Sequence, residues 1–249
     1  MNALILAAGL GTRLKPLTDT MPKALVPVNG KPLLMLLVER LKMSGFDNLV
    51  INVHHFAQQI IDYIYKENSF GINVAISDES DMLLDTGGAI KKAAKLFENS
   101  NPFLVHNVDV FHNLNLKDIY LKNAFAADAT LVVSDRVTSR YLLFNDDYNL
   151  VGWTNLNTGE VKSPFENVRK NPAAYNRFAF SGIHIFSHSL LKRMDKWPDR
   201  FSIIDFYLDA CKDYTIRAIN RLDLQLLDVG KLDSLEQAKE FLNCQTAIL

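Results

Sequence analysis

The chain has 249 residues, of which 48% are hydrophobic and 22% are charged, and its formal net charge is -1. This composition is that of an ordinary globular protein, long enough for one large α/β domain or for a domain with a small subdomain. The sequence has no basic stripe, which argues against nucleic acid as a partner. The two cysteines, Cys211 and Cys244, form no CxxC pair, so we expect neither a disulfide framework nor a structural zinc site. The apolar run Ala3–Ala8 is too short for a signal peptide or a membrane span, and we expect a cytoplasmic protein without a membrane partner.

The first half of the chain alternates short apolar runs with helical patterns. The expected strands cover 3–8, 48–53, 73–76 and 102–108, and the expected helices lie at 32–44, around 56–64 and at 89–97. Such alternation predicts right-handed βαβ crossovers. The fold class that follows is α/β, with a Rossmann-like, mostly parallel central sheet and helices on both faces.

The pattern changes after about residue 129. The expected strands cover 129–133, 141–145, 150–154, 179–186, 215–219 and 225–227, and the expected helices cover 202–211 and 233–242. A turn at 146–149 predicts a hairpin, and the polar stretch 155–176 is interpreted as a long excursion over the site. We expect one domain over 1–249, with one half over about 1–128 and a second, antiparallel half over about 129–249.

A glycine loop follows directly after the first strand. Gly9 and Gly11 there expose backbone N–H groups without a Cβ in the way, which suits phosphate oxygens. Leu14 stands where the dinucleotide fingerprint needs Gly or Ala, and the Gly-Lys-Ser/Thr of a P-loop is absent. Arg13 and Lys23 flank the loop, and two cations beside such a nest suit a polyphosphate. A flexible turn with two solvated charges is the alternative, but the whole cluster directly after the first strand favours phosphate binding.

Two aspartates end buried strands that lie far apart in the sequence. Asp109 follows Val105–Val108, and Asp228 follows Leu226–Leu227. Ligands gather at the carboxyl ends of strands in open α/β sheets, and two carboxylates suffice to hold Mg²⁺ when substrate phosphates complete its shell. Each aspartate alone could simply begin a turn.

The N-terminal motifs resemble the signature of the sugar-1-phosphate nucleotidylyltransferases. The resemblance rests on Leu6–Leu14, Pro16–Thr18 and Pro22–Val28. It implies that Arg13 stabilises the departing pyrophosphate, that Lys23 contacts the α-phosphate, and that Asp109 and Asp228 hold Mg²⁺. The nucleotide-binding residues that it implies are Leu6, Ala8, Gly9, Gly11, Thr12, Arg13, Lys23, Glu79 and Gly88, with Arg13, Lys23 and Asp109 as the catalytic ones.

The resemblance also implies where the base and the sugar bind. Glu79 would lie near the base edge, and Gly88 in Thr86-Gly87-Gly88 would contact the base or the ribose. The sugar-binding candidates are Glu166, Lys170 and Gly182, with Arg169 as another possible cation. The Thr-Gly-Gly form makes the chain most similar to the N-acetylmuramate-1-phosphate uridylyltransferase branch, so the implied substrates are UTP and an amino-sugar 1-phosphate.

The sequence departs from the family at two points of the metal motifs, because Val108 and Lys231 replace the usual Gly and Thr. Other interpretations stay open. They are a guanylyl- or thymidylyltransferase, a cytidylyltransferase for a non-sugar phosphate, a non-catalytic nucleotide-sugar sensor and, more distantly, an NAD-binding dehydrogenase. The oligomeric state is undetermined at this point.

Overall fold

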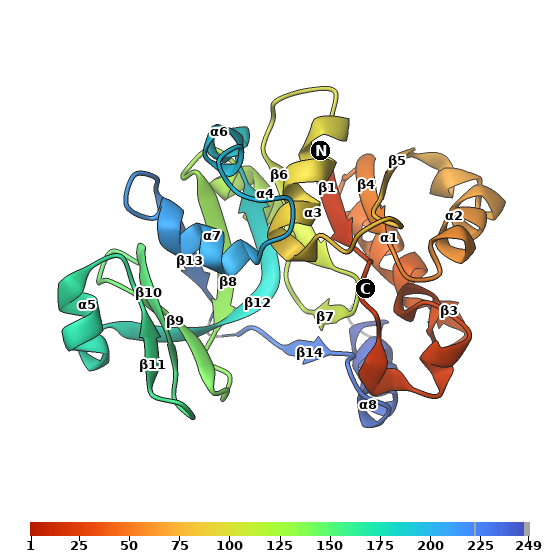
Figure 1. The fold of residues 1–249 in the computed structure, drawn as a ribbon. Coiled ribbons are helices and arrows are strands. Elements are labelled where there is room, and N and C mark those ends of the chain that lie inside the picture. Colours follow the sequence, from red (N-terminus) through yellow and green to blue (C-terminus); the bar gives the residue numbers. More distant parts are fainter. Residues whose placement is uncertain (222, 247–249) are drawn as a thin grey trace.

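Four parallel strands form the N-terminal part of a 10-stranded sheet in the computed structural model, which describes residues 1–221 and 223–246 (Figure 1). These strands are β1 (Asn2–Leu6), β4 (Asn48–Val53), β5 (Asn73–Asp78) and β6 (Phe103–Asn107). β1 lies between β4 and β6, and β5 pairs with β4 at the edge. The predicted α/β fold and each of these four predicted strands are confirmed.

The C-terminal half adds antiparallel strands to the same sheet. β12 (Asn176–Phe186) pairs antiparallel with β6, with β8 (Ala129–Ser134) and with β9 (Arg140–Phe144), and β13 (Ile216–Asn220) runs parallel to β8. The predicted hairpin is formed by β9 and β10 (Leu150–Asn155). The stretch 155–176 is not the long excursion that we expected, because it folds into β11 (Glu160–Lys162) and α5 (Glu166–Lys170) at the outer end of the sheet (Figure 1).

Helices cover both faces of the sheet. Successive side chains of β1 point to opposite faces, and both sets are apolar, so each face must be covered. Ala3 and Ile5 pack in the core on one face, and Leu4 packs in the core on the other. The first core includes side chains of α1 (Leu33–Met43), α2 (Ala57–Lys66), α4 (Leu116–Asn123) and α8 (Asp233–Thr246). The second includes side chains of α3 (Asp85–Ala93), α6 (Leu191–Met194) and α7 (Ile203–Ala210). In the part of the chain that the structure describes, no helix is long and apolar enough to span a membrane.

A bulge in β12 places Gly182 against the end of β6. The register of β12 against β8 shifts between Phe180 and His184, and Gly182 has a φ of 80°. A Cβ added at Gly182 would collide with the side-chain amide of Asn107. The left-handed backbone favours glycine here, and a Cβ would in addition require the Asn107 side chain to move.

We predict that Gly182→Ala destabilises the fold more than a glycine replacement in open space. Gly159→Ala is the matched control, because Gly159 has a φ of 70° and a Cβ added there would have nothing within 4 Å. The control should lose about 1–2 kcal/mol of unfolding free energy to backbone strain, and Gly182→Ala should lose about 1–3 kcal/mol more to overpacking. Denaturant unfolding measures both values, and equal losses would contradict the close packing.

We also predict that the fold loses stability as the pH falls below 6.5, partly because of His184. Burial, with a smaller contribution from His106, lowers the pKa of His184 to about 3, and neither of its ring nitrogens has a hydrogen-bond partner among the described residues. Between pH 6.5 and 3 the unfolded chain binds the proton and the folded chain does not, so unfolding becomes easier as the pH falls.

Replacing His184 by Phe should make the unfolding free energy less dependent on pH between 7 and 4. The ring lies in an aromatic setting, with Phe180 and Tyr207 at centroid distances of 5.4 and 5.7 Å, and another aromatic ring suits it. His55→Phe is the control, since His55 is only partly buried. Urea unfolding at several pH values makes the comparison, and an unchanged pH slope in His184→Phe would count against this explanation.

Candidate functional site

The glycine loop leaves β1 as a series of short turns. Three 3₁₀ turns follow, η1 (Thr12–Leu14), η2 (Leu17–Asp19) and η3 (Lys23–Leu25), in place of a long helix. Gly11 has a φ of 64°, and a Cβ there would lie 2.8 Å from Thr18 Cγ2. The Thr18 hydroxyl donates to the Gly11 carbonyl at 2.8 Å and closes the loop. Gly9 faces open space, so its backbone is accessible to a ligand.

A cavity of about 410 Å³, here called the loop cavity, opens between this loop and the start of α3. Six of the residues predicted from the sequence contribute to its wall, namely Leu6, Ala8, Gly9, Lys23, Glu79 and Asp109. Gly11, Thr12 and Arg13 continue the loop next to Gly9 without lining the cavity. The wall also has residues that were not predicted from the sequence as site residues, and two of them carry polar side chains from other segments. They are Asn52, at the end of β4, and Arg200, which reaches the cavity from a distant segment.

A short ladder brings Asp109 and Asp228 together. β7 (Val110–His112) pairs antiparallel with β14 (Leu226–Asp228), with Asp228 opposite Val110. The amide of Val229 donates to the Asp109 carbonyl at 2.8 Å. Two aspartates separated by more than a hundred residues are thus held side by side through backbone pairing.

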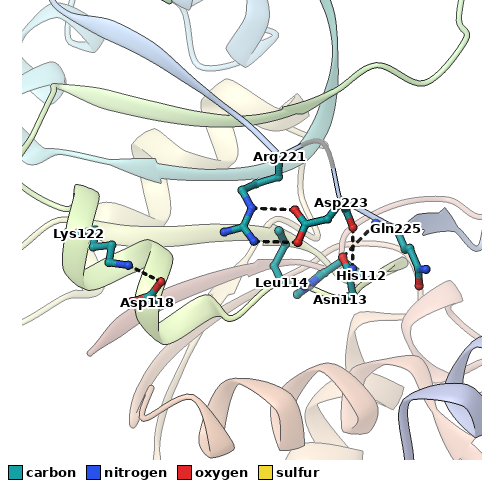
Figure 2. Close-up of polar contacts among 8 residues, drawn as sticks. All are labelled: His112, Asn113, Leu114, Asp118, Lys122, Arg221, Asp223 and Gln225. Carbon is teal, nitrogen blue, oxygen red and sulfur yellow. Dashed lines mark hydrogen bonds and ion pairs between the residues drawn. The ribbon is translucent and has the colours of Figure 1, made fainter. Parts of the chain in front are cut away.

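Asn113 fixes the register of this ladder at its other end (Figure 2). Its side-chain NH₂ donates to the Asp223 carbonyl at 2.8 Å, and its side-chain oxygen accepts from the Gln225 amide at 3.0 Å. Its own amide donates to the Gln225 carbonyl at 3.3 Å. Nothing in the sequence indicated this role, because an asparagine in a polar segment is an ordinary turn residue.

Two buried histidines hold the turn that carries Asp109. The Leu114 amide donates to His112 Nδ1 at 3.0 Å, so the proton of His112 is on Nε2. That proton points to His106 Nε2 at 3.0 Å, and His106 Nδ1 then donates to the Asn107 carbonyl at 2.7 Å. The chain of bonds requires both rings to be neutral, and burial lowers the pKa of both, that of His106 to about 4.

Positive side chains offset the two neighbouring carboxylates. The Lys23 ammonium forms an ion pair with Asp109 Oδ2. Burial, and next the Asp109 carboxylate, raise the pKa of Asp228, whereas the charges of Lys23, Arg13 and Arg136 act in the opposite direction. Gly230 lies between two of these groups, because a Cβ there would be 2.8 Å from Arg13 Nη2 and 3.1 Å from Asp228 Oδ1. The predicted quartet of Arg13, Lys23, Asp109 and Asp228 therefore converges.

The donor set fits a divalent cation that shares its shell with substrate. In the described ranges no group of three or more His, Cys, Asp and Glu side chains forms a metal cage. A partly buried and an exposed carboxylate beside the loop cavity are instead an arrangement that Mg²⁺ accepts, since the ion keeps waters and takes phosphate oxygens as ligands. The raised pKa of Asp228 reflects, after burial, like charges in proximity, which a cation relieves.

The structure gives Glu79 and Gly88 supporting positions. Glu79 is buried, and its carboxylate accepts from the Asn52 side chain at 2.8 Å and from the Leu84 amide at 3.1 Å. The Gly88 amide donates to the Phe201 carbonyl at 3.4 Å, and a Cβ at Gly88 would collide with the Asp199 carbonyl. Gly88 thus packs under the segment around residue 200 and does not line the loop cavity, contrary to its expected contact with the base or ribose.

The predicted sugar-binding residues are not brought together. Gly182 lies against Asn107, close to the carboxylate pair. Glu166 and Lys170 form an exposed ion pair at 2.6 Å on α5, and neither lines the loop cavity or the second cavity described next. Arg169 donates to the Ser163 carbonyl at 2.6 Å.

A second cavity of about 510 Å³, here called the strand cavity, lies between β9–β12 and the start of α7. Its wall includes Trp153 and Phe180 and three cations, Arg136, Arg140 and Lys162. Ser202 at the start of α7 lines it too, so the segment that brings Arg200 to the loop cavity continues into the strand cavity. None of the three cations was predicted from the sequence.

Comparisons with known proteins identify the family. Residues 2–245 match the family model described as nucleotidyl transferase. The chain is 37% identical over 187 residues to N-acetylmuramate alpha-1-phosphate uridylyltransferase of Neisseria meningitidis, covering 75% of each chain. It is 29% identical to D-glycero-alpha-D-manno-heptose 1-phosphate guanylyltransferase of Campylobacter jejuni, covering 92% of this chain and 95% of that protein.

A solved structure resembles the fold throughout. HddC from Yersinia pseudotuberculosis, complexed with GMP-PN, superposes with a TM-score of 0.73 at 28% identity and covers 96% of this chain and 98% of its own. The family resemblance that we inferred from the N-terminal motifs is thereby confirmed, and it extends over nearly the whole sequence. The chain belongs to the nucleotidyl transferase family and is a transferase enzyme.

Proposed function

We propose that this enzyme transfers a uridylyl group from UTP to an amino-sugar 1-phosphate such as N-acetylmuramate 1-phosphate and releases pyrophosphate. The observation that carries the proposal is the convergence of Lys23, Arg13 and the Asp109–Asp228 pair, of which Lys23 and Asp109 line the loop cavity. The choice of uridine and of an amino sugar rests on the likeness to the meningococcal uridylyltransferase.

In the proposed reaction an oxygen of the sugar phosphate attacks the α-phosphorus of the nucleotide in line. The new bond joins that oxygen to the α-phosphorus, and the bond from the α-phosphorus to the bridging oxygen breaks, so its electron pair leaves with pyrophosphate. The attacking oxygen is already anionic, and no protein group has to remove a proton. Catalysis then depends on positioning and on charge neutralisation.

The side chains divide this task by position. Lys23 lines the loop cavity next to Asp109 and would neutralise the α-phosphate. Arg13, exposed beside Gly230, would stabilise the charge that develops on pyrophosphate. The open backbone at Gly9 would receive phosphate oxygens. Asp109 and Asp228 would hold Mg²⁺, which when bound draws negative charge from the phosphate oxygens.

The strand cavity is the proposed acceptor site. The segment around residue 200 contributes Arg200 to the loop cavity and Ser202 to the strand cavity, and Phe180 in the wall of the strand cavity precedes Gly182 by two residues. Gly182 therefore remains a candidate at the acceptor side. Glu166 and Lys170 lie outside both cavities, so the acceptor phosphate is better matched by a cation of the strand cavity.

A guanylyltransferase is the second candidate. It is favoured by the likeness to the heptose 1-phosphate guanylyltransferase of Campylobacter jejuni and to HddC, both of which extend over more than nine-tenths of this chain. The two candidates share the phosphate and metal chemistry and differ in the base.

We predict that pyrophosphate release with Mg²⁺ is fastest with UTP and an amino-sugar 1-phosphate. The assay combines each of four nucleoside triphosphates with a panel of sugar 1-phosphates and omits the acceptor as a control. We expect UTP to exceed GTP at least tenfold in kcat/KM, corresponding to about 1.4 kcal/mol of discrimination. A preference for GTP would select the second candidate, and the absence of pyrophosphate with every pair would contradict the transfer reaction.

We further predict that Asp228→Asn lowers the rate by about 10² or more, because a transition-state charge contact through the metal is lost. The rate should recover in part as the Mg²⁺ concentration rises. Asp223→Asn is the matched control, since it removes a carboxylate of the same segment that pairs with Arg221 at 3.0 Å (Figure 2). The Asp223 carbonyl still accepts from Asn113 in that variant. Equal Mg²⁺ dependence in both variants would contradict the metal assignment.

A further inference from the structure

The strand cavity contains more positive charge than a neutral sugar requires. Lys162 pairs with Asp205 at 3.2 Å and with Glu160 at 4.0 Å, and its ammonium lies 5.3 Å from the centre of the Trp153 ring. These pairs account for Glu160 and Asp205, the two carboxylates in the wall. Arg136 and Arg140 form no ion pair within the described ranges, and the wall, with three cations and two carboxylates, has a net charge of +1.

Arg136 is the cation on the side of the catalytic carboxylates. It contacts β12 at Phe180, two residues before Gly182, and Gly182 packs against Asn107, two residues before Asp109. Its Nη2 also donates to the Phe180 carbonyl at 3.2 Å, which orients the guanidinium along β12. This position matches the phosphate of the acceptor, which must lie next to the carboxylate pair to attack the α-phosphorus.

If Arg136 binds the acceptor phosphate, Arg140 is available to bind a second anionic group. It stands four residues beyond Arg136, so the two Cα atoms are at most about 14 Å apart. Arg140 and Leu142 line the same cavity from β9, and Trp153 of β10, which pairs with Leu142 across the hairpin, adds a flat apolar surface to the wall. A sugar ring on such a surface could present its phosphate to Arg136 and another substituent to Arg140.

We propose that the strand cavity selects an acceptor that carries a carboxylate in addition to its 1-phosphate, and that Arg140 is the specificity-determining residue for that carboxylate. A guanidinium binds a carboxylate through paired, charge-assisted hydrogen bonds, whereas it gains little from a sugar hydroxyl. This inference rests on the proposed function and narrows its acceptor to acidic sugar 1-phosphates.

The test compares two acceptors that differ only in the carboxylate substituent. N-acetylmuramate 1-phosphate and N-acetylglucosamine 1-phosphate share the ring and the phosphate, and the former adds a lactyl ether with a carboxylate. With UTP and Mg²⁺, the wild-type enzyme should show a kcat/KM at least tenfold higher for the acidic acceptor. In Arg140→Gln this ratio should fall at least tenfold, mainly through a higher KM, because the carboxylate is remote from the reacting phosphorus. Arg140→Lys should restore part of the ratio.

The control is Lys122→Gln, which removes one positive charge at an exposed ion pair on α4 and should keep the wild-type ratio (Figure 2). Calorimetric binding of the acidic acceptor to each variant gives a second measurement that does not depend on turnover. A wild-type ratio at or below one, or an unchanged ratio in Arg140→Gln, would overturn the inference while leaving the transfer reaction intact. Absence of pyrophosphate with every acceptor and every nucleotide would instead remove the proposed function itself.

Discussion

The site depends on one constraint, which is that two aspartates of like charge are held together by backbone pairing. The β7–β14 ladder sets Asp228 opposite the residue that follows Asp109, and Asn113 holds its far end. Like charges at this separation oppose folding unless cations compensate them. Lys23, Arg13 and Arg136 provide that compensation, so the groups suited to phosphate also make the carboxylate pair tolerable to the fold. The same positive side chains would therefore serve both the stability of the fold and the proposed reaction.

The buried histidine pair supports this arrangement through its hydrogen bonds. His106 and His112 form a chain of hydrogen bonds that starts at the Leu114 amide and ends at the Asn107 carbonyl. Each ring accepts one bond and donates the next, which only a neutral ring can do. The side chain of Asn107 in turn packs against Gly182 of β12. The turn that carries Asp109 is thus fixed from two sides, which is the kind of support that holds a catalytic group in place.

Local chemistry made the N-terminal site predictable. Short sequence motifs indicate the glycine loop, Lys23 and the strand-end aspartates. The parallel sheet follows from apolar runs that alternate with helical patterns. The contact of Gly88 with a base or ribose stays a prediction, because a glycine at a helix start serves a ligand or a packed backbone equally well, and the structure shows the Asp199 carbonyl packed against it. Arg136 and Arg140 were not predicted, because they line the strand cavity only through tertiary packing, which the spacing of residues in the sequence does not indicate. The role of Asn113 was not predicted for the same reason, since its partners Asp223 and Gln225 lie far away in the sequence.

β12 has a mechanical consequence. Its 11 residues, with one bulge at Gly182, pair with β6, β8 and β9, so a single strand joins the parallel strands of the first half of the chain to the antiparallel strands of the second. Such a strand offers no linker about which the two halves could swing, unlike the hinges of enzymes that close two lobes around a substrate. Capture of substrates would then fall to the loops at the rim, and the spacing between donor and acceptor would be built in before either arrives.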